Sequence, residues 1–240
     1  MKTLLFSTAV LVCCSSFVQA EPQAKPILSD QFERSEKNDA KEQVGNGWTT
    51  NSKSRAMGDK QVDLQDGTLV VKISPRADHA VTVVHQLDFA DCYVKFRFQI
   101  ADKHQLGFNF SDPELKTVHA GHIAGVKVTT NRLAVEDHKY GNFEIERYNR
   151  KKAGADKKEI AKEVALYNRA EKISITPDQW HEMVIVIEGD RITATVDGKQ
   201  TISHQSPGFA HPTKRKIAFS VPKEAVIDDV TIWDVAKPNL

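Results

Sequence analysis

The stretch TPDQWHEMVIVIEGDRITATVDGKQ, residues 176–200, predicts a β-hairpin. Two runs rich in β-branched residues flank Gly189-Asp190, and glycine at the first central position favours a tight two-residue turn of type II′. If Glu188 faces Arg191, three apolar pairs fall on one face: Ile187 with Ile192, Ile185 with Ala194, and Met183 with Val196. A slip of one residue would destroy this match, so the register is well defined. Asp197-Gly198 predicts a second tight turn, of type I′.

Upstream of this hairpin, residues 93–100 form the clearest amphipathic strand, with apolar side chains alternating with polar ones. Residues 106–111 continue the alternation, and we expect the two strands to pair as a hairpin with Phe98 opposite Phe108. That pairing gathers Lys95, Arg97 and Asn109 on one polar, basic sheet face. An ordinary solvated face would show the same alternation, because antiparallel sheets commonly leave one face in water.

Residues 156–170 break the period of two. Ile160, Val164 and Tyr167 recur at helical spacing, and Asp156 is a candidate N-terminal cap. We expect one charged helix here, inserted between strands, either as a solvated surface element or beside a ligand-binding face. Residues 142–148 are expected to form a further strand. About twelve strands with no βαβ alternation predict an all-β fold, an antiparallel two-sheet jelly-roll sandwich.

The first twenty residues have the features of a secretory signal peptide, with Lys2, a short apolar run and a small-x-small end at Ala20. Cleavage after Ala20 would leave residues 21–240 as one secreted or periplasmic domain. An N-terminal membrane anchor, or a lipid on Cys13 or Cys14, is the alternative. Cys92 would be the remaining cysteine, so no intramolecular disulfide is expected. We expect no membrane span in the mature chain, since no second long apolar run follows.

The balance of 33 basic and 32 acidic residues gives no nucleic-acid footprint. The most unusual feature is instead the concentration of histidines, six of nine, between His79 and His138. Neutral imidazole can serve as acid, base, metal ligand or stacking partner for a sugar, although scattered structural histidines explain the same pattern. His119 and His122 alone do not make a zinc site, which needs a third protein ligand, and we expect neither metal nor cofactor.

Two segments carry a family resemblance: WHEMVIVIEGDRITATVDGK at residues 180–199 and IDDVTIWD at residues 227–234. They resemble the late strands of concanavalin A-like lectin/glucanase jelly rolls, and are particularly similar to secreted bacterial 3-keto-disaccharide hydrolase (3-keto-glycoside lyase/hydratase) domains. The resemblance implies a sandwich whose concave face receives a sugar. The glucanase pattern E-x-D-x-x-E is missing, and the pair Glu144 and Glu146 on one predicted strand face is as typical of two solvated glutamates.

These observations predict a carbohydrate ligand, while leaving the enzyme question open. If the domain cleaves glycosides, we expect the catalytic residues to be His119, His122 and Asp137. We expect the substrate-binding residues to be Lys95, Arg97, Asn109 and His138. The alternatives are a non-catalytic, laminin-G-like module for glycans or proteins and a structural envelope domain. If this site assignment is right, His119, His122, Asp137 and Arg97 line one concavity, whereas residues scattered over the surface would remove the main support for the enzyme hypothesis. The substrate, the linkage and the oligomeric state stay open.

Overall fold

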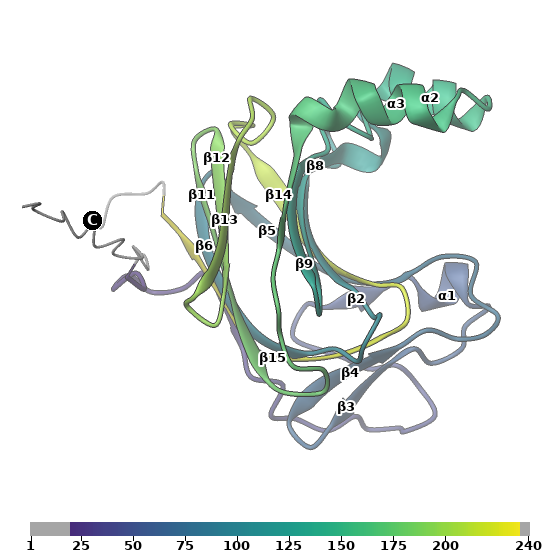
Figure 1. The fold of residues 1–240 in the computed structure, drawn as a ribbon. Coiled ribbons are helices and arrows are strands. Elements are labelled where there is room, and N and C mark those ends of the chain that lie inside the picture. Colours follow the sequence, from purple (N-terminus) through teal and green to yellow (C-terminus); the bar gives the residue numbers. More distant parts are fainter. Residues whose placement is uncertain (1–19, 236–240) are drawn as a thin grey trace, which may run out of the picture.

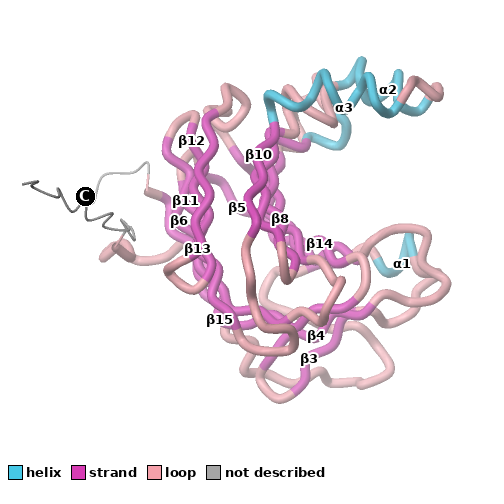
Figure 2. Tube along the Cα trace, in the orientation of Figure 1, coloured by secondary structure: helices cyan, strands magenta, loops and turns pink. Residues whose placement is uncertain are grey.

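The computed structural model describes residues 20–235, and its strands form two packed antiparallel sheets (Figures 1 and 2). Sheet A has the order β13 (Gln200–Gln205), β12 (Arg191–Val196), β11 (His181–Glu188), β6 (Cys92–Gln99), β15 (Glu224–Asp234), β4 (Thr68–Lys72) and β3 (Val62–Gln65), with β1 (Leu28–Asp30) paired to β15. Sheet B has the order β10 (Asn168–Lys172), β9 (Arg132–Asp137), β8 (His122–Thr129), β7 (Leu106–Ser111), β14 (Lys214–Val221), β5 (Val81–Phe89) and β2 (Thr49–Thr50). The predicted all-β two-sheet sandwich is therefore confirmed.

The opening hairpin has the predicted register. Glu188 pairs with Arg191, Ile187 with Ile192, Ile185 with Ala194, and Met183 with Val196 between β11 and β12. The turn at Gly189 has a φ of 56°, which glycine adopts without steric cost. Asp197 and Gly198 have φ values of 53° and 63°, as a type I′ turn requires at both central residues. The apolar face of this hairpin is fully buried in the core between the sheets.

The expected hairpin between residues 93–100 and 106–111 is wrong. β6 pairs with β11 and β15 in sheet A, whereas β7 pairs with β14 and β8 in sheet B. The alternation of both strands was interpreted correctly, but their apolar faces meet across the core instead of side by side in one sheet. The rings of Phe96 and Phe108 stack at a centroid distance of 5.4 Å. The polar faces of the two strands consequently point to opposite sides of the sandwich.

The described chain also contains short helices: α1 (Ser52–Arg55), η1 (His119–Gly121), α2 (Ile145–Lys152), α3 (Lys157–Val164) and η2 (Ala165–Tyr167). The predicted helix is confirmed as α3, and the Asp156 side chain accepts hydrogen bonds from the backbone N–H groups of Lys158 and Glu159. The helix ends earlier than expected, because β10 begins at Asn168.

The strand expected at residues 142–148 is wrong, since α2 begins there. Glu144 caps α2 by accepting hydrogen bonds from the backbone N–H groups of Glu146 and Arg147. This cap removes the strand on which Glu144 and Glu146 would have shared a face. The insert therefore holds two helices rather than one. Figure 1 shows α1 and the α2–α3 pair on the side of sheet B that points away from sheet A.

The proposed signal peptide, its cleavage and the lipidation of Cys13 or Cys14 concern residues 1–19, which lie outside the described residues, so they stay predictions. No helix within residues 20–235 is long and apolar enough to cross a membrane. Cys92 is fully buried in β6, and burial raises the pKa of its thiol far above the usual range.

Candidate functional site

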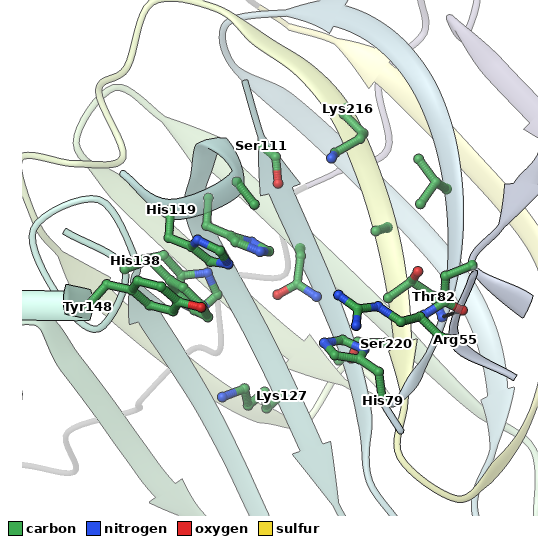
Figure 3. A pocket seen from close by; sticks show the side chains of 18 of the residues that line it. Arg55, His79, Thr82, Ser111, His119, Lys127, His138, Tyr148, Lys216 and Ser220 are labelled. Carbon is green, nitrogen blue, oxygen red and sulfur yellow. Dashed lines mark hydrogen bonds between the residues drawn. The ribbon is translucent and has the colours of Figure 1, made fainter. Parts of the chain in front are cut away.

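A cavity of about 580 Å³ lies on the face of sheet B that points away from sheet A. Alternation along the strands decides which residues face it: on β14, Ile217 and Phe219 are buried in the core while Lys216, Ala218 and Ser220 line the cavity. β5 and β7 contribute in the same way. Figure 3 shows His119, His138 and Tyr148 at one end of this sheet B cavity, with Arg55 and His79 at the other.

The floor of the sheet B cavity is hollow because several strand positions carry very small side chains. Gly107 on β7 and Ala218 and Ser220 on β14 line it, and Gly125 on β8 lies beneath it. A Cβ atom on Gly125 would lie 2.6 Å from His138 Cε1 and 2.7 Å from Asn109 Oδ1. Glycine at this position therefore lets both side chains rest directly on the sheet.

Two histidines, stacked on aromatic rings, form one wall. The imidazole of His119 lies flat against the phenol ring of Tyr148, with centroids 3.7 Å apart and an interplanar angle of 6°. His122 stacks on Phe143 at 4.4 Å. Tyr148 comes from α2 and Phe143 from the loop before it, so the helical insert holds both imidazoles in place. We call His119, His122, His138, Phe143 and Tyr148 the histidine wall.

Both stacked imidazoles are neutral at neutral pH. Burial, with a contribution from the Lys152 ammonium, lowers the pKa of His119. Burial lowers the pKa of His122 further, to about 3, and the neighbouring His138 and Lys216 add to this effect. The Nδ1 atom of His122 is buried without a hydrogen-bond partner. A neutral imidazole can accept or donate one proton, so these rings suit proton transfer or hydrogen bonding to an oxygen.

The third histidine is held by an acidic residue below the floor. His138 Nε2 lies 3.2 Å from Glu136 Oε2, and Lys127 Nζ donates to the same oxygen at 2.7 Å. Burial alone would raise the pKa of Glu136, but its bonds to His138 and Lys127 outweigh burial and lower the pKa to about 2. Glu136 is thus a carboxylate at all physiological pH values, and it fixes the orientation of the His138 ring.

The sheet B cavity is positively charged. Arg55, Lys127 and Lys216 line it, while none of the lining residues found in the described chain is an aspartate or a glutamate. The Lys216 ammonium has no hydrogen bond or ion pair within residues 20–235, and burial lowers its pKa. This excess of cations is local, since the whole chain is nearly balanced in charge. The lining therefore lacks the carboxylate pair of a double-displacement glycosidase.

Four of the seven predicted site residues meet in this cavity: His119, His122, Asn109 and His138. Asp137 does not line it. Its side chain is fully buried at the end of β9, where it accepts hydrogen bonds from Ser206 Oγ at 2.5 Å, Gly208 N at 2.9 Å and Tyr140 N at 3.0 Å. These hydrogen bonds connect Asp137 to the two loops that contain Tyr140 and Ser206. Side chains alternate along β9, so Asp137 lies on the same face as the core residues Leu133 and Val135, and Glu136 lies on the opposite face.

Lys95 and Arg97 lie on β6 in sheet A, so they are not on the face that holds the cavity. Lys95 forms an ion pair with Glu21. Arg97 lies over the Trp180 ring at 4.6 Å and pairs with Asp229 at 3.4 Å. Their expected place beside Asn109 depended on the β6–β7 hairpin, and it fails with that hairpin. Asp137 and Arg97 do not share the concavity with His119 and His122, so the predicted site is wrong in these two residues, and a catalytic role can rest only on the groups that line the cavity.

Sequence reasoning missed Phe143, Tyr148, Arg55 and Lys216. The sequence analysis placed Tyr148 in a strand. Glu144 is a possible N-terminal cap, and a helix beginning after it would have placed Tyr148 correctly in residues 145–152. Lys216 lies at a polar position in the alternation of β14, which gave a usable signal. Nothing local in the sequence brings Arg55 of α1 to this face. No group of three or more histidine, cysteine, aspartate or glutamate side chains in the described part of the chain could hold a metal ion.

Comparison with known proteins places this arrangement in a family. The model of the 3-keto-alpha-glucoside-1,2-lyase-like domain matches residues 38–232. The chain belongs to this family. The match includes every residue of the histidine wall, together with Arg55 and Lys216. A search of curated proteins found no match.

Solved structures of low sequence identity share the concanavalin A-like fold. A laminarinase from Flavobacterium sp. UMI-01 is 11% identical, with 87% of this chain and 100% of that chain covered and a TM-score of 0.55. The non-specific endo-beta-1,3(4)-glucanase SCLam, from family GH16, is 12% identical over 89% and 92%, with a TM-score of 0.56. The carbohydrate-binding module CBM66 from Bacillus subtilis is 13% identical over 78% and 95%, with a TM-score of 0.50. At these identities the likeness concerns the fold alone.

Proposed function

We propose that this protein binds a 3-keto-glycoside in the sheet B cavity and breaks its glycosidic bond by 1,2-elimination. The observation that carries the proposal is the chemistry of the lining: neutral imidazoles and cations, with no carboxylate among the described lining residues. Hydrolysis by two carboxylates would need a different set of groups. The family description, a 3-keto-alpha-glucoside-1,2-lyase-like domain, agrees with this chemistry.

Elimination from such a sugar needs a base and a way to stabilise negative charge. The ketone at C3 makes the hydrogen at C2 acidic, because its removal leaves an enolate. The enolate then forms the C1–C2 double bond while the bond from C1 to the leaving oxygen breaks and that oxygen takes the electron pair. The proton removed from C2 balances the reaction when it is delivered to the leaving oxygen. A hydrogen-bond donor to the C3 oxygen lowers the energy of the enolate-like transition state.

His119 is our candidate for the group that moves this proton. Its imidazole is neutral, makes no hydrogen bond to other residues within 20–235, and is held flat against Tyr148. A fixed, neutral imidazole with a free lone pair is suited to general base catalysis, and the resulting imidazolium can return the proton to the leaving oxygen. His119 is also less buried than His122, so it is the stronger base of the two.

His122 is our candidate for binding the C3 carbonyl oxygen. Its pKa of about 3 keeps the ring neutral at neutral pH. A neutral imidazole can donate an N–H hydrogen bond to the carbonyl oxygen and keep its proton. Because Nδ1 is buried and unpartnered, we assign the proton to Nε2, the nitrogen that would donate to the sugar. Asn109, which rests on Gly125 beside His138, supplies a second polar contact to the sugar.

The test is turnover of a 3-keto-glycoside by the purified protein and by His119→Asn. We expect release of the leaving alcohol by the wild type and a loss of about a hundredfold or more in the variant, as removal of a general base typically causes. His104→Asn is the matched control, since His104 lies outside the cavity and bonds to the Glu224 carbonyl oxygen. Equal turnover by wild type and His119→Asn would refute the role of His119. Binding of the sugar without turnover would instead favour the non-catalytic glycan-binding module.

A further inference from the structure

The end of the sheet B cavity opposite the histidine wall has no role in the proton transfer proposed above. It carries Arg55 from α1 and His79 from the loop before β5, while Lys216 of β14 lies on the side of the cavity between this end and the histidine wall (Figure 3). Arg55 and Lys216 come from separate parts of the chain, and folding brings both positive charges to the lining of one cavity. We propose that this end binds an anionic group of the substrate, a carboxylate, sulfate or phosphate on the sugar. This inference rests on the proposed binding of a 3-keto-glycoside.

Lys216 is the strongest evidence. Its neighbours in register on the adjoining strands are Gln86 of β5 and Ser111 of β7, and neither is acidic. The side chain is half-buried, and within residues 20–235 its ammonium has no ion-pair or hydrogen-bond partner. An ammonium loses hydration free energy on burial, and an opposite charge within about 4–6 Å normally compensates for that loss. A ligand anion would supply this charge.

Arg55 adds a second cation that the protein leaves largely uncommitted. Among residues 20–235 its single ion pair is with Asp78 at 3.4 Å, and the Asp78 side chain is 66% exposed, so water screens this contact strongly. The planar guanidinium can form two parallel hydrogen bonds to a carboxylate, sulfate or phosphate group. Lys127, by contrast, is already paired with Glu136 at 2.7 Å. The free positive charge of the cavity is therefore concentrated on Lys216 and Arg55.

The anion matters for selectivity rather than for the chemical step. A neutral sugar would leave Lys216 half-buried without a partner, whereas an acidic sugar would pair with it on binding. The preference should weaken as salt concentration rises, because screening reduces the attraction between partly exposed charges. A lyase with this cavity would therefore act on glycosides that contain an acidic sugar.

The test compares binding of four probes by calorimetry: methyl 3-keto-glucoside and its analogues with a carboxylate, a sulfate or a phosphate at C6. We expect the wild type to bind at least one anionic analogue about tenfold or more tightly than the neutral sugar, as one charge-assisted contact allows. Lys216→Met should abolish this preference while affinity for the neutral sugar changes by less than about threefold. Lys216→Arg should keep it. Lys162→Met, an exposed lysine of α3, is the matched control for loss of one charge.

Three results overturn the inference. Wild-type protein that binds the neutral sugar as tightly as all three anionic analogues refutes it and leaves the proposed function intact. An unchanged preference in Lys216→Met would also refute it. Failure to bind any of the four sugars would refute both this inference and the proposed function. The comparison among the wild-type affinities requires no variant, so it holds even if a substitution at β14 impairs folding.

Discussion

Asp137 is predicted to be a structural residue whose loss destabilises the fold. Its Oδ2 atom accepts hydrogen bonds from Ser206 Oγ and Gly208 N, and its Oδ1 atom accepts one from Tyr140 N. Asp137→Asn keeps the shape of the side chain but replaces one acceptor oxygen by an NH₂ group. Either orientation of the amide turns that group toward a backbone N–H donor, so one donor is left unpaired in a fully buried place.

The cost follows from these contacts. Leaving a buried donor unsatisfied costs about 1–3 kcal/mol, and the remaining bonds lose the extra strength that a charged acceptor provides. We therefore expect the free energy of unfolding to fall by about 3 kcal/mol. For a domain of this size, 1 kcal/mol corresponds to about 2–4 °C, so Tm should fall by about 6–12 °C.

Thermal and urea unfolding, followed by circular dichroism, measure this effect. The matched control is Asp88→Asn, since Asp88 is an exposed carboxylate on β5 and its replacement should change Tm by less than about 2 °C. At a temperature where Asp137→Asn is folded, its turnover should be close to that of the wild type. An unchanged Tm together with abolished turnover would refute the structural role and restore the catalytic one.

Three further predictions concern the floor and the histidine wall. Glu136 has a pKa lowered from 4.5 to about 2, so it contributes up to about 3 kcal/mol of stability above pH 4.5, and this contribution is lost as the pH falls toward 2. In urea unfolding, the advantage of the wild type over Glu136→Gln should fall by about half or more between pH 6 and pH 3. An equal advantage at both pH values would contradict this. Gly125→Ala should displace the side chains of His138 and Asn109, because its Cβ would overlap them. We expect turnover to fall by at least about tenfold and the free energy of unfolding to fall by about 1–3 kcal/mol. Full activity would show that the contact of these side chains with Gly125 is unimportant. Tyr148→Ala removes the ring on which the proposed base stacks, so kcat should fall more than with Tyr148→Phe, and equal kcat values would exclude a stacking role.

Local pattern determined how much of the fold was predictable. The β11–β12 register and the cap of α3 follow from contacts between residues close in sequence, and both were predicted correctly. The prediction that β6 and β7 pair in one sheet was wrong. Alternation shows which side chains of a strand face the core, but it does not show which of the two sheets the strand belongs to. The choice of sheet depends on long-range packing such as the Phe96–Phe108 stack.

The same limit applies to the site. His119, His122 and His138 were predicted from their concentration in one stretch of sequence, and they lie on or beside the neighbouring strands β8 and β9. Asn109 was predicted from a hairpin with β6 that does not form, yet the alternation of β7 turns it toward the cavity. Arg55 and Lys216 reach the cavity from distant parts of the chain. Alternation along β14 turns Lys216 away from the core, but sequence spacing does not show that either residue lies beside the histidines. Asp137 shows the opposite error: it adjoins His138 in sequence, yet the alternation of β9 turns its carboxylate away from the cavity.

The most direct test of the proposed elimination is to follow the hydrogen at C2 of a 3-keto-glycoside in D₂O by NMR. Elimination requires that this hydrogen leave the sugar, so the wild type should remove it as the leaving alcohol appears and a C1–C2 enone forms. His119→Asn should slow both events together. Release of the alcohol with the C2 hydrogen retained would mean cleavage by direct attack at C1, and it would contradict the proposed mechanism.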